Sequence, residues 1–134
     1  MSKIKCYISH SIRGKYGKSA TTEQMIENNQ KAIEFYQKLQ KKFPTVDFYC
    51  PGFHDEFVMV AFTEGYMNEK QILAVDCIII GRCNCIVNYV PDGYLSDGMM
   101  VENIHGQLNG MPVLVMRGCE DYKVFARWLD SLKS

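Results

Sequence analysis

The sequence predicts a single α/β domain on a parallel, doubly wound sheet in the flavodoxin-like (Rossmann-like) order, with four to five strands and helices on both faces. Short apolar runs alternate with longer amphipathic segments along the chain. The apolar runs are nearly continuous, which is typical of parallel strands that are covered on both faces. At 134 residues the chain is long enough for one such domain, which we place at residues 1–134.

The first half is expected to contain two strands separated by a long helix. The apolar run at residues 4–9 is the first strand, and a polar loop over residues 11–20 follows it. Thr21 and Gln24 stand at capping-box spacing, which predicts a helix that runs from there to about residue 42. Its buried side is expected to hold the apolar residues at helical spacing: Ile26, Ile33, Tyr36, Leu39 and Phe43.

Pro44 ends this helix, and residues 46–49 form a short second strand that leads into a less regular segment. Residues 68–82 fit two structures. The three isoleucines at 78–80 are β-branched and suit a strand, yet the apolar residues around them also follow a helical stripe. We favour a helix, because the apolar run at 85–90 then supplies the third strand and strands and helices keep alternating.

The last third of the chain continues this alternation. Ser96 or Asp97 can cap a helix after the third strand, because either side chain can accept a hydrogen bond from a free amide of the first turn. Gly110 stands where such helices stop. A fourth strand is expected over residues 113–116, and a final helix over residues 121–132.

Charge and cysteine content narrow the function classes. Fifteen basic and fifteen acidic residues cancel, so no overall field attracts nucleic acid or a membrane surface. We expect a cytoplasmic protein, because the N-terminus lacks a signal-peptide core and no apolar segment is long enough to span a bilayer. Cys6, Cys77 and Cys85 lie in apolar runs and are expected to be buried, reduced thiols. No metal site is expected, because Cys83 and Cys85 have no second Cys/His pair at zinc-site spacing.

Two segments predict a ligand site at the carboxyl ends of the strands, where open α/β sheets bind ligands. Glu102 lies about one turn into a helix, where the helix dipole favours an ionised carboxylate that can act as nucleophile or base. The loop after the first strand holds Ser11, Arg13 and Gly14, which suit an anion. The loop matches no dinucleotide or triphosphate motif. The structural alternative is an acidic residue that merely suits a helix start and a solvated arginine.

Two short patterns also resemble those of a known family. The first lies on the first strand and its loop: Tyr7-x-x-x-Ser11-Ile12-Arg13-Gly14. The second begins the helix after the third strand: Ser96-x-Gly98-x-x-x-Glu102. Both resemble the 2′-deoxynucleoside 5′-monophosphate N-glycosidases, which are relatives of the nucleoside 2-deoxyribosyltransferases. The resemblance spans about residues 5–116 and implies a nucleoside 2-deoxyribosyltransferase-like domain over residues 1–134.

The resemblance implies roles for three residues. Glu102 becomes the nucleophile, and Tyr7 contacts its carboxylate. Asp76 stands eight residues before Asn84, as the family's aspartate stands before the next strand, and it protonates or holds the departing base. The implied reaction is hydrolysis of a nucleoside 5′-monophosphate through a glycosyl-enzyme on Glu102, without metal or cofactor. Relatives form dimers in which the neighbouring subunit helps close the pocket, so a homodimer is also implied.

Ser96 separates the two families, because the transferases place an aspartate at this position to meet a free 5′-hydroxyl. A carboxylate would repel a phosphate, whereas a hydroxyl can donate to it. The amides at the start of the helix add to the phosphate pocket, provided that the Asp97 carboxylate points away. The expected phosphate-binding residues are Ser11, Ile12, Arg13, Gly14, Ser96, Asp97 and Gly98.

The sequence leaves open the roles of two histidines and does not exclude two other functions. His10 stands where the glycosidases usually have glycine, and His54 is expected on the base side of the pocket. The same residues would serve a transferase, in which a second base rather than water resolves the intermediate. A nucleotide-binding module without turnover is the third possibility. It would not need a nucleophile with an orienting tyrosine.

Overall fold

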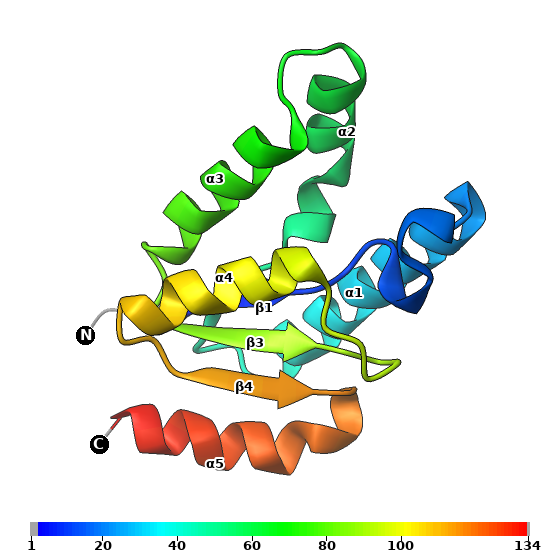
Figure 1. Ribbon diagram of the computed structural model, residues 1–134. Helices are drawn as coiled ribbons and strands as arrows, with labels where there is room; N and C mark the ends of the chain where they lie inside the picture. Colours follow the sequence, from blue (N-terminus) through cyan, green and yellow to red (C-terminus); the bar gives the residue numbers. More distant parts are fainter. Residues whose placement is uncertain (1–2, 134) are drawn as a thin grey trace.

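A four-stranded sheet lies between helices in the computed structural model, which describes residues 3–133 (Figure 1). The strands are β1 (Lys5–Ser9), β2 (Asp47–Tyr49), β3 (Cys85–Tyr89) and β4 (Val113–Met116). All neighbouring strands pair in parallel, in the order β2-β1-β3-β4. This confirms the predicted α/β class and the doubly wound, flavodoxin-like order, with four strands. Among the described residues, no helix is both long enough and apolar enough to cross a membrane.

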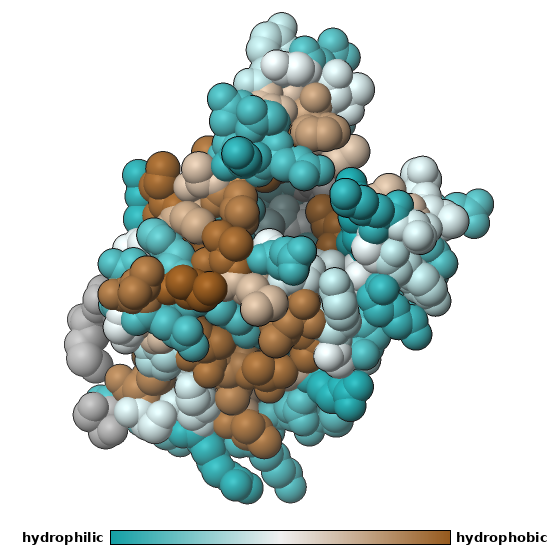
Figure 2. Space-filling model, in the orientation of Figure 1, coloured by the Kyte–Doolittle hydropathy of each residue, from teal (hydrophilic) through white to brown (hydrophobic). Residues whose placement is uncertain are grey.

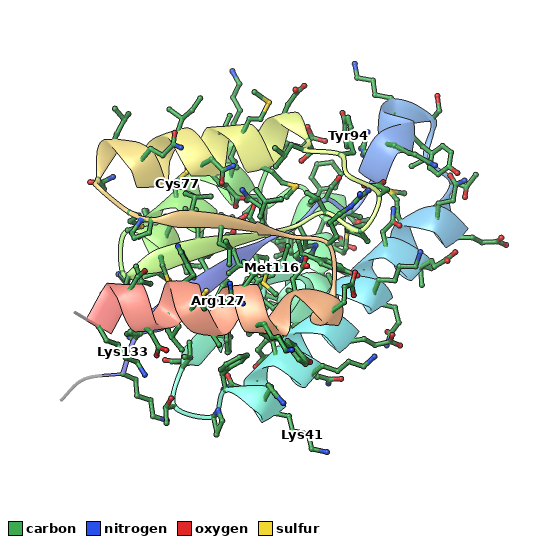
Figure 3. All side chains as sticks on the ribbon, turned by 90° about the horizontal axis from the view of Figure 1, so that it is seen from below. Lys41, Cys77, Tyr94, Met116, Arg127 and Lys133 are labelled. Carbon is green, nitrogen blue, oxygen red and sulfur yellow. The ribbon has the colours of Figure 1, made fainter. Side chains whose placement is uncertain are left out.

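One face of the sheet is covered by α1 (Thr22–Lys42) and α5 (Tyr122–Lys133). Figure 3 shows α1 and α4 on opposite sides of the strands, with α5 in front. The core on the α1 side joins Phe35 and Leu39 of α1 to Phe125 and Leu129 of α5, over the inward side chains of β1, β2 and β3. The capping box of Thr21 and Gln24 is present, so the start of α1 is confirmed.

The predicted buried side of α1 is wrong in part. Ala32, Phe35 and Leu39 form the buried stripe, and Ile26 is 65% exposed. Ile33 and Tyr36 are only partly buried. The first turns of α1 do not lie over the sheet. They lie beside the loop after β1, and the Asn28 side-chain amide donates to the Ile12 carbonyl of that loop. Ile26 therefore has no core to enter.

The other face carries α3 (Glu69–Ile80) and α4 (Asp97–Leu108), which pack side by side. The helix predicted over residues 68–82 is thus confirmed, and Asn68 and Gln71 cap it. Gly106 lets α4 approach the sheet, because a Cβ there would lie 2.4 Å from Ile86 Cδ1. The Ser96 hydroxyl caps α4 by accepting from the Met99 amide, which makes Ser96 rather than Asp97 the N-cap.

The cysteines follow the prediction in two of three cases. Cys6 and Cys85 are fully buried on neighbouring strands and lie opposite one another in the sheet. Cys77, on α3, is only partly buried, so its predicted burial is too strong. Cys77 lies one turn before Ile80 on the same side of α3, but Ile80 is the residue of this helix that is buried in the core.

The segment after β2, which we predicted to be irregular, is helical. It comprises a short 3₁₀ turn, η2 (Pro51–His54), and the helix α2 (Asp55–Thr63). In Figure 1, α2 stands with α3 on one side of the sheet and projects away from it. Phe57, Val60 and Phe62 of α2 are all exposed. The sequence failed to predict α2 because apolar residues occupy most of its sides, so it shows no amphipathic period.

Candidate active site

A cavity of about 440 Å³ opens at the carboxyl ends of β1 and β2 and the start of α4. Figure 2 shows the recess between the α2–α3 projection and the turn η1 (Gly14–Ser19). Of the site residues that the sequence predicted, all but His54 line this cavity: Tyr7, Ser11, Ile12, Arg13, Gly14, Asp76, Ser96, Asp97, Gly98 and Glu102. The fold thus brings together residues that are up to 95 positions apart.

Glu102 is the buried acid of the cavity. Only 6% of its surface is exposed, and both carboxylate oxygens accept hydrogen bonds. The Tyr7 hydroxyl donates to Oε2 over 2.5 Å, and the Ser9 hydroxyl donates to Oε1 over 2.8 Å. Two donors from one strand therefore fix the orientation of this carboxylate.

Ser9 was missed by the sequence analysis, although a signal for it exists. Residues two apart on a strand point to the same face of the sheet. A tyrosine at position 7 that reaches a helical carboxylate therefore brings the side chain at position 9 to the same side. Ser9 is fully buried, and a buried hydroxyl needs a hydrogen-bond partner. The Glu102 carboxylate is that partner.

Two of the four acidic groups in the cavity wall, Glu102 and Asp76, have raised pKa values. Burial raises the pKa of Glu102 to about 7, against the lowering effect of the hydrogen bonds from Tyr7 and Ser9, and the charge of Asp76 adds to the rise. Burial raises the pKa of Asp76 to about 6. Because the two groups interact, they titrate as a pair, and near neutral pH the pair passes through a state with one proton.

Asp76 comes from α3 and is bordered by apolar residues. Ile72 and Leu73 precede it by one turn and so share its side of the helix. All three line the cavity, together with Val58 of α2 and Pro51 of η2. This part of the cavity can hold a flat apolar group next to a proton donor.

His54, which we expected on the base side, is not part of the cavity wall. Its ring stacks on Tyr49, with centroids 5.1 Å apart and planes at 20°. Tyr49 does line the cavity and also stacks on Tyr7, at 5.7 Å and 18°. The turn η2 carries His54 behind Tyr49. The prediction that His54 lines the base side of the cavity is therefore wrong. Tyr49, which the sequence analysis did not name, lines the cavity instead.

The loop after β1 and the start of α4 add hydroxyl and cationic groups to the cavity wall. The Ser11 hydroxyl accepts from the Gly14 amide over 2.8 Å, and the Ser96 hydroxyl accepts from the Met99 amide over 3.2 Å. A hydroxyl that accepts in this way still has its own proton to donate. Both serines can therefore donate to an anion in the cavity.

Two cations accompany these hydroxyls. Arg13 lines the cavity and forms an ion pair with Glu69, at 3.7 Å, across its mouth. Lys18, which the sequence analysis did not single out, also lines the cavity. Gly14 has φ of +61°, and a Cβ there would lie 3.0 Å from the Asn28 amide nitrogen, so glycine is required for this turn.

Gly98 and Asp97 form the wall at the start of α4. A Cβ on Gly98 would meet only Ser96 Oγ, at 4.0 Å, so the space beside it belongs to the cavity and not to the protein core. The free amides of this first turn are suited to an anion. Asp97, whose carboxylate has to point away from a bound phosphate, is also part of the wall, as predicted.

His10 closes the remaining side. Its Nε2 accepts from the Gly52 amide over 3.1 Å, and the Asn29 side chain donates to the Gly52 carbonyl over 3.1 Å. Burial lowers the pKa of His10 to about 4, so the ring is neutral and carries its proton on Nδ1. A Cβ on Gly52 would lie 2.4 Å from Asn29 Oδ1. This clamp therefore fixes η2 against the loop after β1.

Comparison of the chain with protein-family models, with curated proteins and with solved structures finds no match. Among the side chains that the structure describes, no group of three or more His, Cys, Asp or Glu residues is placed to hold a metal ion. The cavity wall combines a positioned carboxylate, a second acid with apolar neighbours, serine hydroxyls and two cations.

Proposed function

We propose that this protein is an N-glycosidase that cleaves a nucleoside or deoxynucleoside 5′-monophosphate to free base and sugar 5-phosphate. The observation that carries the proposal is the pair of hydrogen bonds from Tyr7 and Ser9 to the two oxygens of buried Glu102. A pure binding site has no need of a buried carboxylate held in this way, because burying its charge costs free energy. A nucleophile does need a fixed orientation.

We place the substrate phosphate with the cationic and hydroxyl groups of the cavity wall, and its base with the apolar groups beside Asp76. Arg13, Lys18 and the two serine hydroxyls suit the phosphate. The Asp76 carboxyl would repel a phosphate but can donate a proton to a base nitrogen. The base therefore lies against Ile72 and Leu73, and the sugar lies between the phosphate and the base, over Glu102.

The first chemical step breaks the N-glycosidic bond. The reactive form of the one-proton pair carries its proton on Asp76 and leaves Glu102 ionised; it is the less populated of the two one-proton forms, because the pKa of Glu102 is the higher one. An oxygen of the Glu102 carboxylate forms a bond with the anomeric carbon, on the face opposite the base. The bonding pair leaves with the base nitrogen, which takes the proton of Asp76. The transition state has oxocarbenium character, which the nearby carboxylate stabilises. A glycosyl-enzyme and a neutral base result.

Water resolves the glycosyl-enzyme in the second step. Its oxygen bonds to the anomeric carbon as the ester bond to Glu102 breaks, and its proton passes to the Asp76 carboxylate. This regenerates ionised Glu102 and protonated Asp76. If a second base takes the place of water, the same residues perform a transfer reaction.

The test is chromatography of ribo- and deoxyribonucleoside 5′-monophosphates after incubation with wild type, Glu102→Gln and Glu34→Gln. Glu34 is an exposed carboxylate on α1 and serves as the matched control. We expect base release by wild type and Glu34→Gln only. Base exchange in the presence of a second base, without hydrolysis, would indicate the transferase. Tight binding without product, unchanged in Glu102→Gln, would contradict both enzymes and leave a nucleotide-binding module.

We also propose that the protein is a homodimer through the outer side of α3 and α4. Val101, Ile104 and Leu108 lie at helical spacing on α4 and are 44–83% exposed. Val75 and Ile78 of neighbouring α3 extend this apolar surface, which is visible in Figure 2. Two copies of one helix pair make a self-complementary, two-fold interface. Light scattering should show that wild type is a dimer and that Ile104→Glu is a monomer. A wild-type monomer at micromolar concentration would contradict the proposal.

A further inference from the structure

Tyr49 occupies a distinctive place in the cavity wall. It ends β2 and lies opposite Tyr7 of β1 in the parallel register, so the two side chains leave the sheet on the same face. The Tyr7 ring is stacked on it from the inner strand, and the His54 ring is stacked on it from η2. Because both flanking rings are nearly parallel to Tyr49, its faces are taken by protein. The ring therefore presents its edge and hydroxyl to the cavity.

Tyr49 and the second acid of the site, Asp76, line the same cavity. The charge of Asp76 contributes to the raised pKa of Tyr49, after burial, and it also acts on Tyr7. Tyr49 consequently keeps its proton throughout the neutral range and is a hydrogen-bond donor there. The substrate phosphate is an unsuitable target, because the proposed function assigns it to Arg13 and Ser11 in the loop after β1.

We propose that the Tyr49 hydroxyl contacts the base of the substrate and, together with Asp76, assists its departure by donating a hydrogen bond to the base. This inference rests on the proposed N-glycosidase function and adds a catalytic residue to it. Asp76 transfers the proton, whereas Tyr49 donates to a second acceptor on the base as negative charge develops there. His54 acts only through Tyr49, because its stacked ring holds the Tyr49 ring in its orientation. The target is therefore a base with at least two acceptor atoms on the edge that faces α3 and β2.

The experiment compares two substrates that differ in their leaving group. One is the nucleoside 5′-monophosphate that wild type hydrolyses best. The other is 4-nitrophenyl 2-deoxyribose 5-phosphate, whose nitrophenolate departs without a proton. Tyr49→Phe keeps the stacked ring and removes the hydroxyl alone. Tyr36→Phe is the matched control, because Tyr36 of α1 packs edge-on against Phe53 of η2 and does not line the cavity.

For Tyr49→Phe we expect kcat/KM on the nucleotide to fall by roughly tenfold, the size of one hydrogen bond. On the nitrophenyl substrate it should stay within about twofold of wild type, since no base is present to receive the bond. Asp76→Asn should show the same pattern with a larger loss, and Tyr36→Phe should resemble wild type on both.

Three outcomes overturn the inference. Undiminished nucleotide cleavage by Tyr49→Phe would show that the hydroxyl does not contact the base. An equal loss on both substrates would show that Tyr49 only supports the shape of the site. If wild type cleaves neither substrate, the proposed function fails as well, and the inference fails with it. The first two outcomes leave the N-glycosidase itself intact.

Discussion

Tyr7 on β1 and Glu102 on α4 are joined by a hydrogen bond of 2.5 Å, although 95 positions separate them in the chain. The bond fixes the start of α4 over the central strand and places the carboxylate at the floor of the cavity. Ser9 adds a second bond from the same strand. The same hydrogen bond therefore orients the proposed nucleophile and helps to hold α4 on the sheet, so a substitution at Glu102 will change both the activity and the stability of the protein.

The acid pair predicts a bell-shaped pH profile for kcat/KM with a maximum between about pH 6 and 7. Below this window both carboxyls are protonated and the nucleophile is lost. Above it both are ionised and the proton donor is lost. His10, whose pKa is about 4, and Tyr7 and Tyr49, whose pKa values are raised, titrate outside the window. The profile should be measured from about pH 4.5 to 9.

Asp76→Asn is the control for this profile. The variant has no acid to ionise, so the decline at high pH should disappear while overall activity is reduced. Loss of the neighbouring charge should also move the remaining ionisation, that of Glu102, to lower pH. A profile that is flat across the neutral range in wild type would contradict the assignment of the pair.

Glu102→Gln should stabilise the fold at alkaline pH. The pKa of Glu102 is about 7 in the folded protein, against an ordinary value of 4.5. The folded state thus binds this proton more tightly, and ionisation costs folding free energy. The cost is absent below about pH 4.5 and complete above about pH 7, where it is on the order of 3 kcal/mol.

Urea denaturation at pH 8 and pH 5 measures this effect. The free energy of unfolding of Glu102→Gln should exceed that of wild type at pH 8, and the difference should shrink towards pH 5. Glu34→Gln, on the exposed side of α1, should show no such pH dependence. If Glu102→Gln were destabilised equally at both pH values, ionisation of the buried Glu102 carboxyl would not cost folding free energy, and the prediction would be wrong.

Gly98→Ala should weaken substrate binding without loss of stability. Its Cβ would stand in the cavity, where the nearest protein atom is Ser96 Oγ at 4.0 Å, and alanine is favourable within a helix. We expect the KM for the monophosphate to rise by about tenfold, which corresponds to the loss of one hydrogen bond to an anion. The melting temperature should stay unchanged. Calorimetric unfolding and steady-state kinetics check the two parts separately.

Gly106→Ala on the same helix is the matched contrast. Its Cβ would lie 2.4 Å from Ile86 Cδ1, so α4 must move away from the sheet. Overpacking of this kind costs about 1–3 kcal/mol. If Gly98→Ala destabilised the protein as much as Gly106→Ala, the space beside Gly98 would have to be core and not a ligand site.

Glu69→Gln should lower the KM for the phosphorylated substrate. Glu69 pairs with Arg13 at 3.7 Å across the mouth of the cavity and so competes with the substrate phosphate for the guanidinium. An exposed ion pair contributes about 0–1 kcal/mol, so KM should fall by up to about fivefold with kcat unchanged. Glu27→Gln breaks a similarly exposed pair with Lys31 on α1, away from the cavity, and should leave KM unaltered. A rise in KM for Glu69→Gln would mean that Glu69 positions Arg13 for the substrate.

The sequence alone determined the order of the strands and of the α-helices other than α2, and it predicted ten of the 22 residues that line the cavity. Apolar runs, capping residues and Gly110 mark the element boundaries through local physics, because propensity and capping act over a few residues. Parallel strands also bring their carboxyl ends to one edge of the sheet, so Tyr7, Ser11 and Glu102 had to meet there. These features follow from pattern and topology.

Only the tertiary structure decided which side chains touch. The α2 helix lacked an amphipathic period, and the position of Ile26 on α1 depended on where the sheet ends. His54 moved behind Tyr49 because the turn η2 sets its direction. Ser9 reached Glu102 because α4 approaches the sheet closely at Gly106. Contacts of this kind depend on distances between elements far apart in the chain, and no local pattern of residues encodes those distances.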